Sequence, residues 1–142
     1  MHILRKRRAH GDRGAAAVEF ALVVIPLLLV IGGIVNFGVA FANQISLDNA
    51  VRQAARAGVV DVNPAPDLSD IVTAEYHPLA ASSDPDVLFP LRTTCEGSTF
   101  GQSLSVTAEV TTDFLFPWPL PDSLLPSEIV LDSEAEFQCE FS

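Results

Sequence analysis

The stretch from Gly14 to Ala42, GAAAVEFALVVIPLLLVIGGIVNFGVAFA, decides the fold of this chain of 142 residues. From Phe20 onward its only side chain with a polar head is Asn36. The run of 23 residues from Phe20 to Ala42 makes roughly 34 Å of helix, and the hydrocarbon core of a bilayer is about 30 Å thick. The sequence therefore predicts one transmembrane helix over residues 15–42.

One carboxylate, Glu19, stands directly before the apolar run. A charge at the centre of a membrane helix costs at least ~2.5 to 3.5 kcal/mol on insertion scales, and less near the interface. A lone Glu at the start of such a helix therefore suggests that its carboxylate has a functional role and an interaction partner.

Basic residues are concentrated before the helix. The leader, residues 1–14, holds five of the eight basic residues of the chain, and the next positive charge is Arg52. The positive-inside rule predicts a cytoplasmic leader and an exported C-terminal part. The whole chain has a formal net charge of −10, with seventeen of its eighteen acidic residues after the leader. Such an acidic ectodomain argues against binding of nucleic acid or anionic lipid.

Two other interpretations fit the same N-terminus. In the first, the basic start and apolar run form a secretory signal peptide that is cut after Ala42, which releases a soluble domain from Asn43. The apolar run is longer than the ~7 to 15 residues of such peptides. In the second, the helix is an uncut single-pass anchor, Glu19 reaches the interface, and the acidic domain acts as a binding module.

The helix is expected to continue beyond the membrane. Residues 43–58 form a predicted extension, because Asn43 to Ala57 lacks Gly and Pro and its apolar residues recur at helical spacing. Gly58 is a suitable stop. Pro26 predicts a kink, since proline removes one backbone donor and clashes with the carbonyl four residues earlier.

A family resemblance rests on these residues. The Gly14–Phe20 segment, the apolar run interrupted by Pro26, the Phe37-Gly38 pair and the segment Leu47–Gly58 resemble TadE-like minor pseudopilins of tight-adherence pili, a kind of type IV pilin-like precursor. The resemblance implies a pilus assembly protein, a minor pilin-like subunit that joins a tight-adherence pilus or its membrane base.

The resemblance also implies roles for named residues. A prepilin peptidase would cut between Gly14 and Ala15 at the cytoplasmic face, which makes these two the processing site. The new α-amine of Ala15 is a cation, and Glu19 would supply the opposite charge on its own subunit or a neighbour, because an unpaired buried ion is costly. Ala15, Glu19 and Phe20 are then the assembly contact.

The implied partners are the prepilin peptidase, other pilin-like subunits, the membrane platform of a pilus machine and the lipid bilayer. The implied location is the bacterial cell membrane, crossed once, with the N-terminus cytoplasmic and the C-terminal domain extracytoplasmic or in the assembled pilus. Cell adhesion is the process to which such a pilus belongs.

Residues 59–142 read as a small acidic extracytoplasmic α+β domain. A short helix is predicted from Asp67 to Tyr76 with Asp67 or Ser69 as its cap, and a turn or loop over 82–86. Two strands with alternating polarity follow, and the proline-rich segment between them forms their connection. The predicted inner faces are Leu104, Val106, Ala108, Val110, Thr112, Phe114 and Phe116, and Ile129, Leu131, Ser133, Ala135, Phe137, Cys139 and Phe141.

A two-stranded hairpin is not stable alone in water, so its inner face must pack on another element, for which the helix is the candidate. Cys95 and Cys139 are the only cysteines, and both lie on the side predicted to be exported, where disulfides persist. A bridge would close a loop worth ~3 to 4.7 kcal/mol in the chain-entropy estimate. Two buried free thiols are the alternative.

The sequence offers little for catalysis. His77 is the only histidine outside the leader and has no orienting partner nearby in sequence. The cysteines lack zinc spacing, and Asp84-Pro85-Asp86 lacks the glycine and distal Glu of a calcium loop. We therefore expect no enzyme activity, no metal or other cofactor and no small-molecule substrate. Trp118, among prolines, is either a contact point for another subunit or packs on its own domain.

Overall fold

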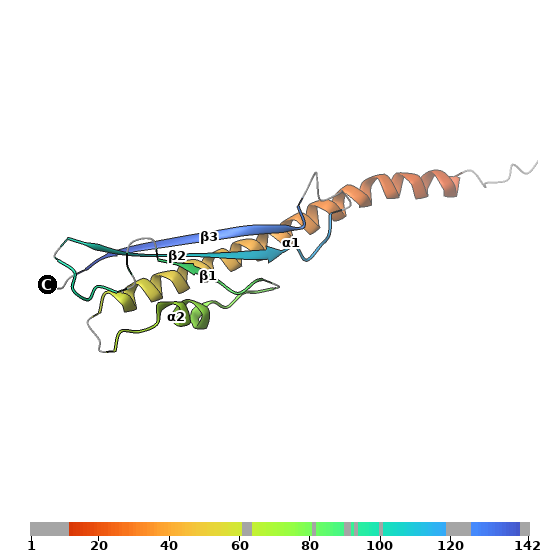
Figure 1. The fold of residues 1–142 in the computed structure, drawn as a ribbon. Helices are drawn as coiled ribbons and strands as arrows, with labels where there is room; N and C mark the ends of the chain where they lie inside the picture. The colour runs from red at the N-terminus through yellow and green to blue at the C-terminus, as the bar shows by residue number, and fades with distance from the viewer. Residues whose placement is uncertain are drawn as a thin grey trace, which may run out of the picture. The chain divides into compact units, whose positions relative to one another are not determined.

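The computed structural model describes residues 12–60, 64–80, 82–89, 92, 94–99, 101–118 and 126–139. Within them it contains a long helix α1 (Asp12–Gly58), a short helix α2 (Leu68–Glu75) and the strands β1 (Asp86–Leu88), β2 (Ser103–Asp113) and β3 (Glu128–Gln138) (Figure 1). The chain divides into two compact units, the first ending at Ile34 and the second beginning at Val35. The predicted α+β class, a long N-terminal helix followed by a small β-rich domain, is confirmed.

Helix α1 begins at Asp12, three residues before the predicted start, and ends at Gly58 as expected. Pro26 lies inside it, and the helical assignment continues on both sides. Because proline has no N–H, the carbonyl of Leu22 has no helical donor there. The kink at Pro26 remains a prediction.

In the second unit, one face of α1 is buried and forms one side of the core. Its buried positions advance by alternating steps of four and three residues, which keeps them on one side of a helix with 3.6 residues per turn. Those from Leu47 onward join α2 and the strands in one core cluster. The buried positions are Asn36, Ala40, Asn43, Leu47, Ala50 and Ala54, flanked by Val39, Val51 and Ala55.

The sheet has the order β1-β2-β3, and both neighbouring pairs are antiparallel. The β2–β3 hairpin is in register from Ser103 opposite Gln138 to Asp113 opposite Glu128. Its inner face is buried, and the acidic row of β3 is exposed, as the alternation predicted. The buried residues are Leu104, Val106, Ala108, Val110, Thr112, Leu131, Ser133 and Ala135, and the exposed acids are Asp132, Glu134 and Glu136.

Three details differ from the sequence predictions. β1 lies partly where only a turn or loop was expected, because three residues are too few to show alternation. Phe116, predicted on the inner face, is 51% exposed because β2 ends at Asp113. Phe137 is 37% exposed near the end of β3. The predicted inner residue Phe141 and part of the proline-rich connection, residues 119–125, lie outside the described residues.

Helix α2 agrees with its prediction. Asp67 is its N-cap, and the side chain accepts hydrogen bonds from the backbone N–H groups of Ser69 (2.9 Å) and Asp70 (3.4 Å). These bonds satisfy donors that the first turn of a helix leaves without partners. Leu68 and Val72 then enter the core that α1 and the strands share.

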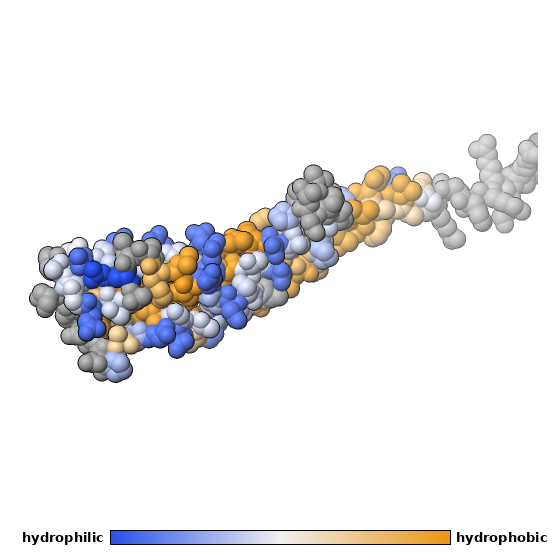
Figure 2. All heavy atoms as spheres, viewed as in Figure 1, coloured by the Kyte–Doolittle hydropathy of each residue, from blue (hydrophilic) through white to orange (hydrophobic). Residues whose placement is uncertain are grey.

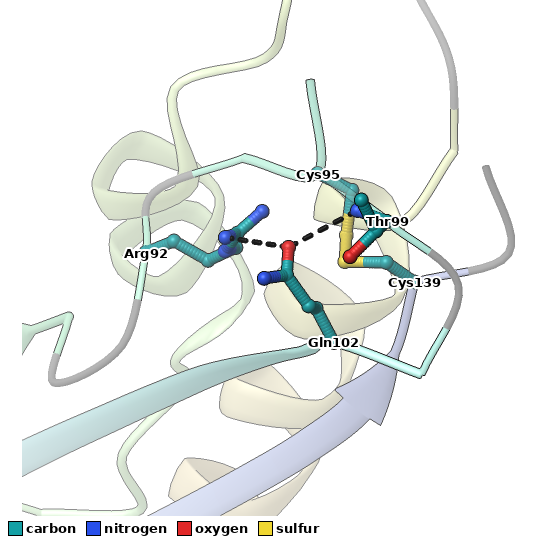
Figure 3. The surroundings of a disulfide bond; sticks show 5 residues. All are labelled: Arg92, Cys95, Thr99, Gln102 and Cys139. Atoms are coloured by element: carbon teal, nitrogen blue, oxygen red, sulfur yellow. Dashed lines mark hydrogen bonds between the residues drawn. A yellow bond between two sulfur atoms is a disulfide. The ribbon is translucent and has the colours of Figure 1, made fainter. Parts of the chain in front are cut away.

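A disulfide joins Cys95 to Cys139 across 44 positions of the chain, as expected from the sequence. The Cα atoms are 5.7 Å apart, inside the usual range for a disulfide. Figure 3 shows Gln102 beside the bridge. Its side-chain oxygen accepts from the N–H of Thr99 (3.1 Å) and from Arg92 (2.9 Å), and its carbonyl accepts from the N–H of Cys139 (2.7 Å). The bridge therefore ties the loop before β2 to the end of β3.

We expect the double substitution Cys95→Ala with Cys139→Ala to lower the free energy of unfolding by about 4 kcal/mol, because the unfolded chain regains the entropy of an open loop. Chemical denaturation in detergent, followed by far-ultraviolet circular dichroism, measures this loss. A reducing agent should shift the parent protein to the midpoint of the variant and leave the variant unchanged. Equal midpoints for the parent and the variant without a reductant would contradict the stabilising role of the bridge.

Two glycines of α1 make a matched pair for a packing test. A Cβ at Gly58 would lie 2.5 Å from a methyl of Leu104 and 2.9 Å from one of Leu68, whereas a Cβ at Gly38 would meet nothing within 4 Å. Gly58 does not have a positive φ, so close packing is the reason for glycine there. Gly38→Ala should stabilise by up to about 1 kcal/mol through helix propensity. Gly58→Ala should instead destabilise by about 1–2 kcal/mol through overpacking, and denaturation midpoints that rise together for both variants would refute this explanation.

Candidate functional site

The segment from Gly14 to Phe20 lies within the first three turns of α1, and all its residues are exposed. The space around Gly14 is open, because a Cβ built there meets no atom within 4 Å. The Gly14–Ala15 bond lies within the first turn, where the N–H groups of a helix have no intrahelical acceptors. This bond is therefore exposed, and it lies in a turn that is held by fewer backbone hydrogen bonds than the interior of the helix.

The three residues of the expected assembly contact are Ala15, Glu19 and Phe20. Ala15 and Glu19 are four positions apart and so lie on one face of α1. No hydrogen bond or ion pair links Glu19 to another residue in the described part of the chain. The nitrogen of Ala15 is a peptide N–H in the uncut chain, so the amine that would pair with Glu19 is formed only by cleavage.

The apolar part of α1 after Phe20 is also uncovered. A helix from Gly14 to Gly58 meets the length and composition of a membrane span, with a mean hydropathy of 2.7 in its most apolar 18-residue window and none of that window buried. Figure 2 shows hydrophobic residues on the visible face of this part of the helix. This segment fits a single-pass membrane anchor. Its large exposed residues up to Ile34 include Phe20, Leu22, Val23, Ile25, Leu27, Leu28, Val30 and Ile31.

Near the start of the second unit, Asn36, the lone polar residue of the apolar run, makes two hydrogen bonds to the backbone of Phe116. Its side-chain amide donates to the carbonyl of Phe116 (2.8 Å), and its side-chain oxygen accepts from the N–H of the same residue (2.9 Å). Asn36 is 1% exposed. One side chain of α1 thus satisfies both backbone groups of a residue 80 positions later, just beyond the end of β2.

Further along α1, other polar side chains make the same kind of contact. Asn43, which is fully buried, donates to the hydroxyl of Thr112 (3.2 Å) and accepts from the N–H of Leu79 (2.8 Å). Gln44 donates to the carbonyl of Asp132 (2.8 Å). We call Asn36, Asn43, Gln44 and Ser46 the polar anchor of α1; Ser46 accepts from the N–H of His77 (2.8 Å). These residues fix α1 to the end of β2 and the segment just beyond it, to β3, and to the segment after α2.

The polar anchor was not predicted from the sequence. A polar residue in an apolar run indicates that its side chain needs a hydrogen-bond partner, and Asn36 is such a residue. The partner of Asn36 could not be predicted, because every residue except proline has the same backbone N–H and carbonyl groups as Phe116. A buried amide costs roughly 1–3 kcal/mol when it loses its hydrogen bonds, so each of these pairings specifies a position on the helix.

Other residues singled out in the sequence contribute no chemistry to the site. His77 contacts Ser46 through its backbone, and Asp84 and Asp86 lie in or before β1. Among the described residues, no group of three or more His, Cys, Asp or Glu side chains is placed to hold a metal ion. The indole nitrogen of Trp118 is buried and has no hydrogen-bond partner in the described part of the chain.

Three asparagines of α1 test the polar anchor. We expect Asn36→Ala and Asn43→Ala each to lower the free energy of unfolding by about 1–3 kcal/mol, because each leaves buried backbone or hydroxyl groups unpaired. Asn49→Ala is the control, since Asn49 is exposed on the same helix and gains the same helix propensity. Denaturation midpoints measure the difference, and equal values for all three variants would contradict the role of the anchor.

Comparisons with known proteins concern the helical segment. No curated protein and no solved structure gave a significant match to the chain. The family model of TadE-like proteins matches residues 14–56, a range that begins at the predicted processing site and includes the whole polar anchor. Over this helical segment the resemblance to the TadE-like family is therefore confirmed.

Proposed function

We propose that this protein is a minor pilin-like subunit of a tight-adherence pilus. A prepilin peptidase cuts it after Gly14, and its N-terminal helix then joins the pilus or the membrane base of the pilus. The TadE-like match over residues 14–56 supports a role in association with a pilus. The TadE-like family is one of structural and assembly proteins rather than of enzymes. The peptidase and the other pilin-like subunits are its proposed partners.

One observation carries this proposal: the segment that begins at Gly14 has no buried residue up to Phe20, and the apolar window that follows is wholly uncovered. A long uncovered apolar helix requires a bilayer or other helices around it. An open glycine at its start gives a peptidase access to the bond. The folded second unit needs none of these residues for its core, so they are free to act in processing and assembly.

The charges give the proposed chemistry of assembly. Cleavage converts the peptide nitrogen of Ala15 into a cationic α-amine, four residues from the carboxylate of Glu19. When the helix enters an apolar bundle, pairing of the two charges lowers the cost of burying either one. The basic leader stays in the cytoplasm in this arrangement, and the acidic C-terminal unit lies outside.

The mature N-terminus tests the processing step. Mass spectrometry of the protein from its native membrane should find Ala15 as the first residue, with or without a methyl group. Met1 at the N-terminus would support an uncut anchor, and Asn43 would support a secreted domain. Gly14→Leu should abolish cleavage, because a large side chain replaces the open space before the bond, while the matched variant Gly38→Leu should be cut normally. Normal cleavage of Gly14→Leu would refute the assignment of this bond.

The role of Glu19 is tested after cleavage. Glu19→Gln should be processed normally but should enter the pilus or its base about tenfold less, which corresponds to about 1.4 kcal/mol of lost pairing. Quantitative immunoblotting of the assembled and membrane fractions measures this ratio. Glu75→Gln, which changes an exposed carboxylate of α2, is the control and should assemble like the parent. Unchanged assembly of Glu19→Gln would mean that this carboxylate is only an interfacial residue.

A further inference from the structure

Two segments far apart in the sequence bring aromatic residues together where α1 enters the second unit. On α1, Phe37 lies next to Asn36, and its ring is 6.3 Å from the ring of Phe114, at a tilted angle of 57°. Beyond the end of β2, Phe116 is held by both hydrogen bonds from Asn36. The start of the β2–β3 connection is therefore fixed beside the first turns of α1 in this unit.

The side chains at this place are exposed although they are large and apolar. Phe37 is 61% exposed, and Phe41, one turn further on the same face of α1, is 68% exposed. In the connection, Leu115 is 49% and Phe116 is 51% exposed. We call these four residues the apolar rim. Soluble surfaces seldom gather such residues without a partner that covers them.

The length of the uncovered helix indicates what covers the rim. The segment 14–34 has 21 residues and spans roughly 31 Å, which matches a hydrocarbon core of about 30 Å without any residue from the second unit. Glu19 then lies about 7.5 Å from the Gly14 end of this span, within two turns of the interface toward which its side chain extends. If this segment fills the core, Val35 lies at its edge. The residues that follow, Asn36 to Phe41, then lie in the interfacial layer, where aromatic side chains are enriched in membrane proteins.

The charges near the rim agree with this placement. Residues 35–47 of α1 and residues 114–118 contain no charged side chain. Among the described residues of the hairpin, the nearest charges are the carboxylates of Asp113 and Glu128, which are opposite each other in the register, and the connection adds one more acidic residue in its sequence, Asp122. With carboxylates and no basic residue there, contact with lipid must come from apolar burial and not from attraction to anionic headgroups.

We propose that the apolar rim inserts into the interfacial layer of the bilayer that α1 crosses. In this arrangement the span ends near Val35, earlier than the Ala42 boundary expected from the sequence, and the Asn36–Phe116 contact marks the level of the membrane surface. The domain then sits on the bilayer through two elements, α1 and the start of the β2–β3 connection. This inference rests on membrane insertion of α1 from the proposed function, and it does not depend on cleavage after Gly14.

The only tryptophan of the chain, Trp118, follows the rim by two residues and serves as a natural depth probe. The full-length protein is reconstituted into vesicles of zwitterionic phosphatidylcholine that carry bromine either near the headgroup end or near the methyl end of the acyl chains. We expect the headgroup-end bromine to quench Trp118 fluorescence about twofold more than the methyl-end bromine, as for an interfacial tryptophan. Added salt or anionic lipid should not strengthen the quenching.

Two leucines of nearly equal exposure supply the matched variants. Leu115→Asp should reduce the quenching by about half, because a carboxylate resists entry into the bilayer. Leu88 is 52% exposed on β1 and pairs with Thr107, about 20 Å along β2 from Asp113. Leu88→Asp should therefore leave the quenching unchanged. Thermal unfolding by circular dichroism verifies that both variants remain folded.

Three results would overturn the inference. If the protein floats with the vesicles but neither bromine position quenches Trp118, the rim does not touch lipid, and the proposed function is unaffected. If Leu115→Cys copies cross-link in these vesicles while lipid quenching is absent, a second copy covers the rim instead. If the protein fails to float with the vesicles, α1 is not inserted, and both this inference and the membrane anchor of the proposed function fail.

Discussion

The structure depends on the exchange of two hydrogen bonds between Asn36 and the backbone of Phe116. An amide in an apolar run is costly when unpaired, and so are the N–H and carbonyl groups of an irregular segment beyond a strand. The Asn36 side chain donates to the carbonyl of Phe116 and accepts from its N–H, so the groups on both sides are paired. The contact fixes the level on α1 at which the β2–β3 connection begins. From there the alternating steps of four and three residues bring Leu47, Ala50 and Ala54 into the core with the strands.

The Asn36 contact separates two parts of α1 that have different roles. From Asn36 to Gly58 the helix packs against the inner face of the sheet, which must be buried against another element. The Cys95–Cys139 bridge ties the segment before β2 to the end of β3. From Gly14 to Ile34 the helix has no buried residue and remains available for lipid and neighbouring helices. In the proposed function, cleavage and assembly use only this first part of α1, so the folded domain stays intact in both steps.

Much of this was predictable because it follows from local patterns. The length of the apolar run predicted the long helix, and the alternation of polarity predicted β2 and β3. The Asp67 cap predicted α2, and the two cysteines, on the side expected to be exported, predicted the bridge. The three-residue β1 was too short for alternation to reveal it, and the exposure of Phe116 depended on where β2 ends. The contact of Asn36 could not be predicted, because its partner is backbone. The processing and assembly roles of Gly14, Ala15, Glu19 and Phe20 come from family resemblance and need other proteins to be seen.

The most direct measurement is the hydrogen exchange rate of the Phe116 amide, read by nuclear magnetic resonance on the detergent-solubilised protein. Phe116 lies beyond β2, and its N–H is bonded to the side chain of Asn36 at 2.9 Å. We expect this amide to exchange far more slowly than that of Leu115, its neighbour in the same irregular segment. An unprotected Phe116 amide, exchanging as fast as Leu115, would contradict the central role of the Asn36 contact.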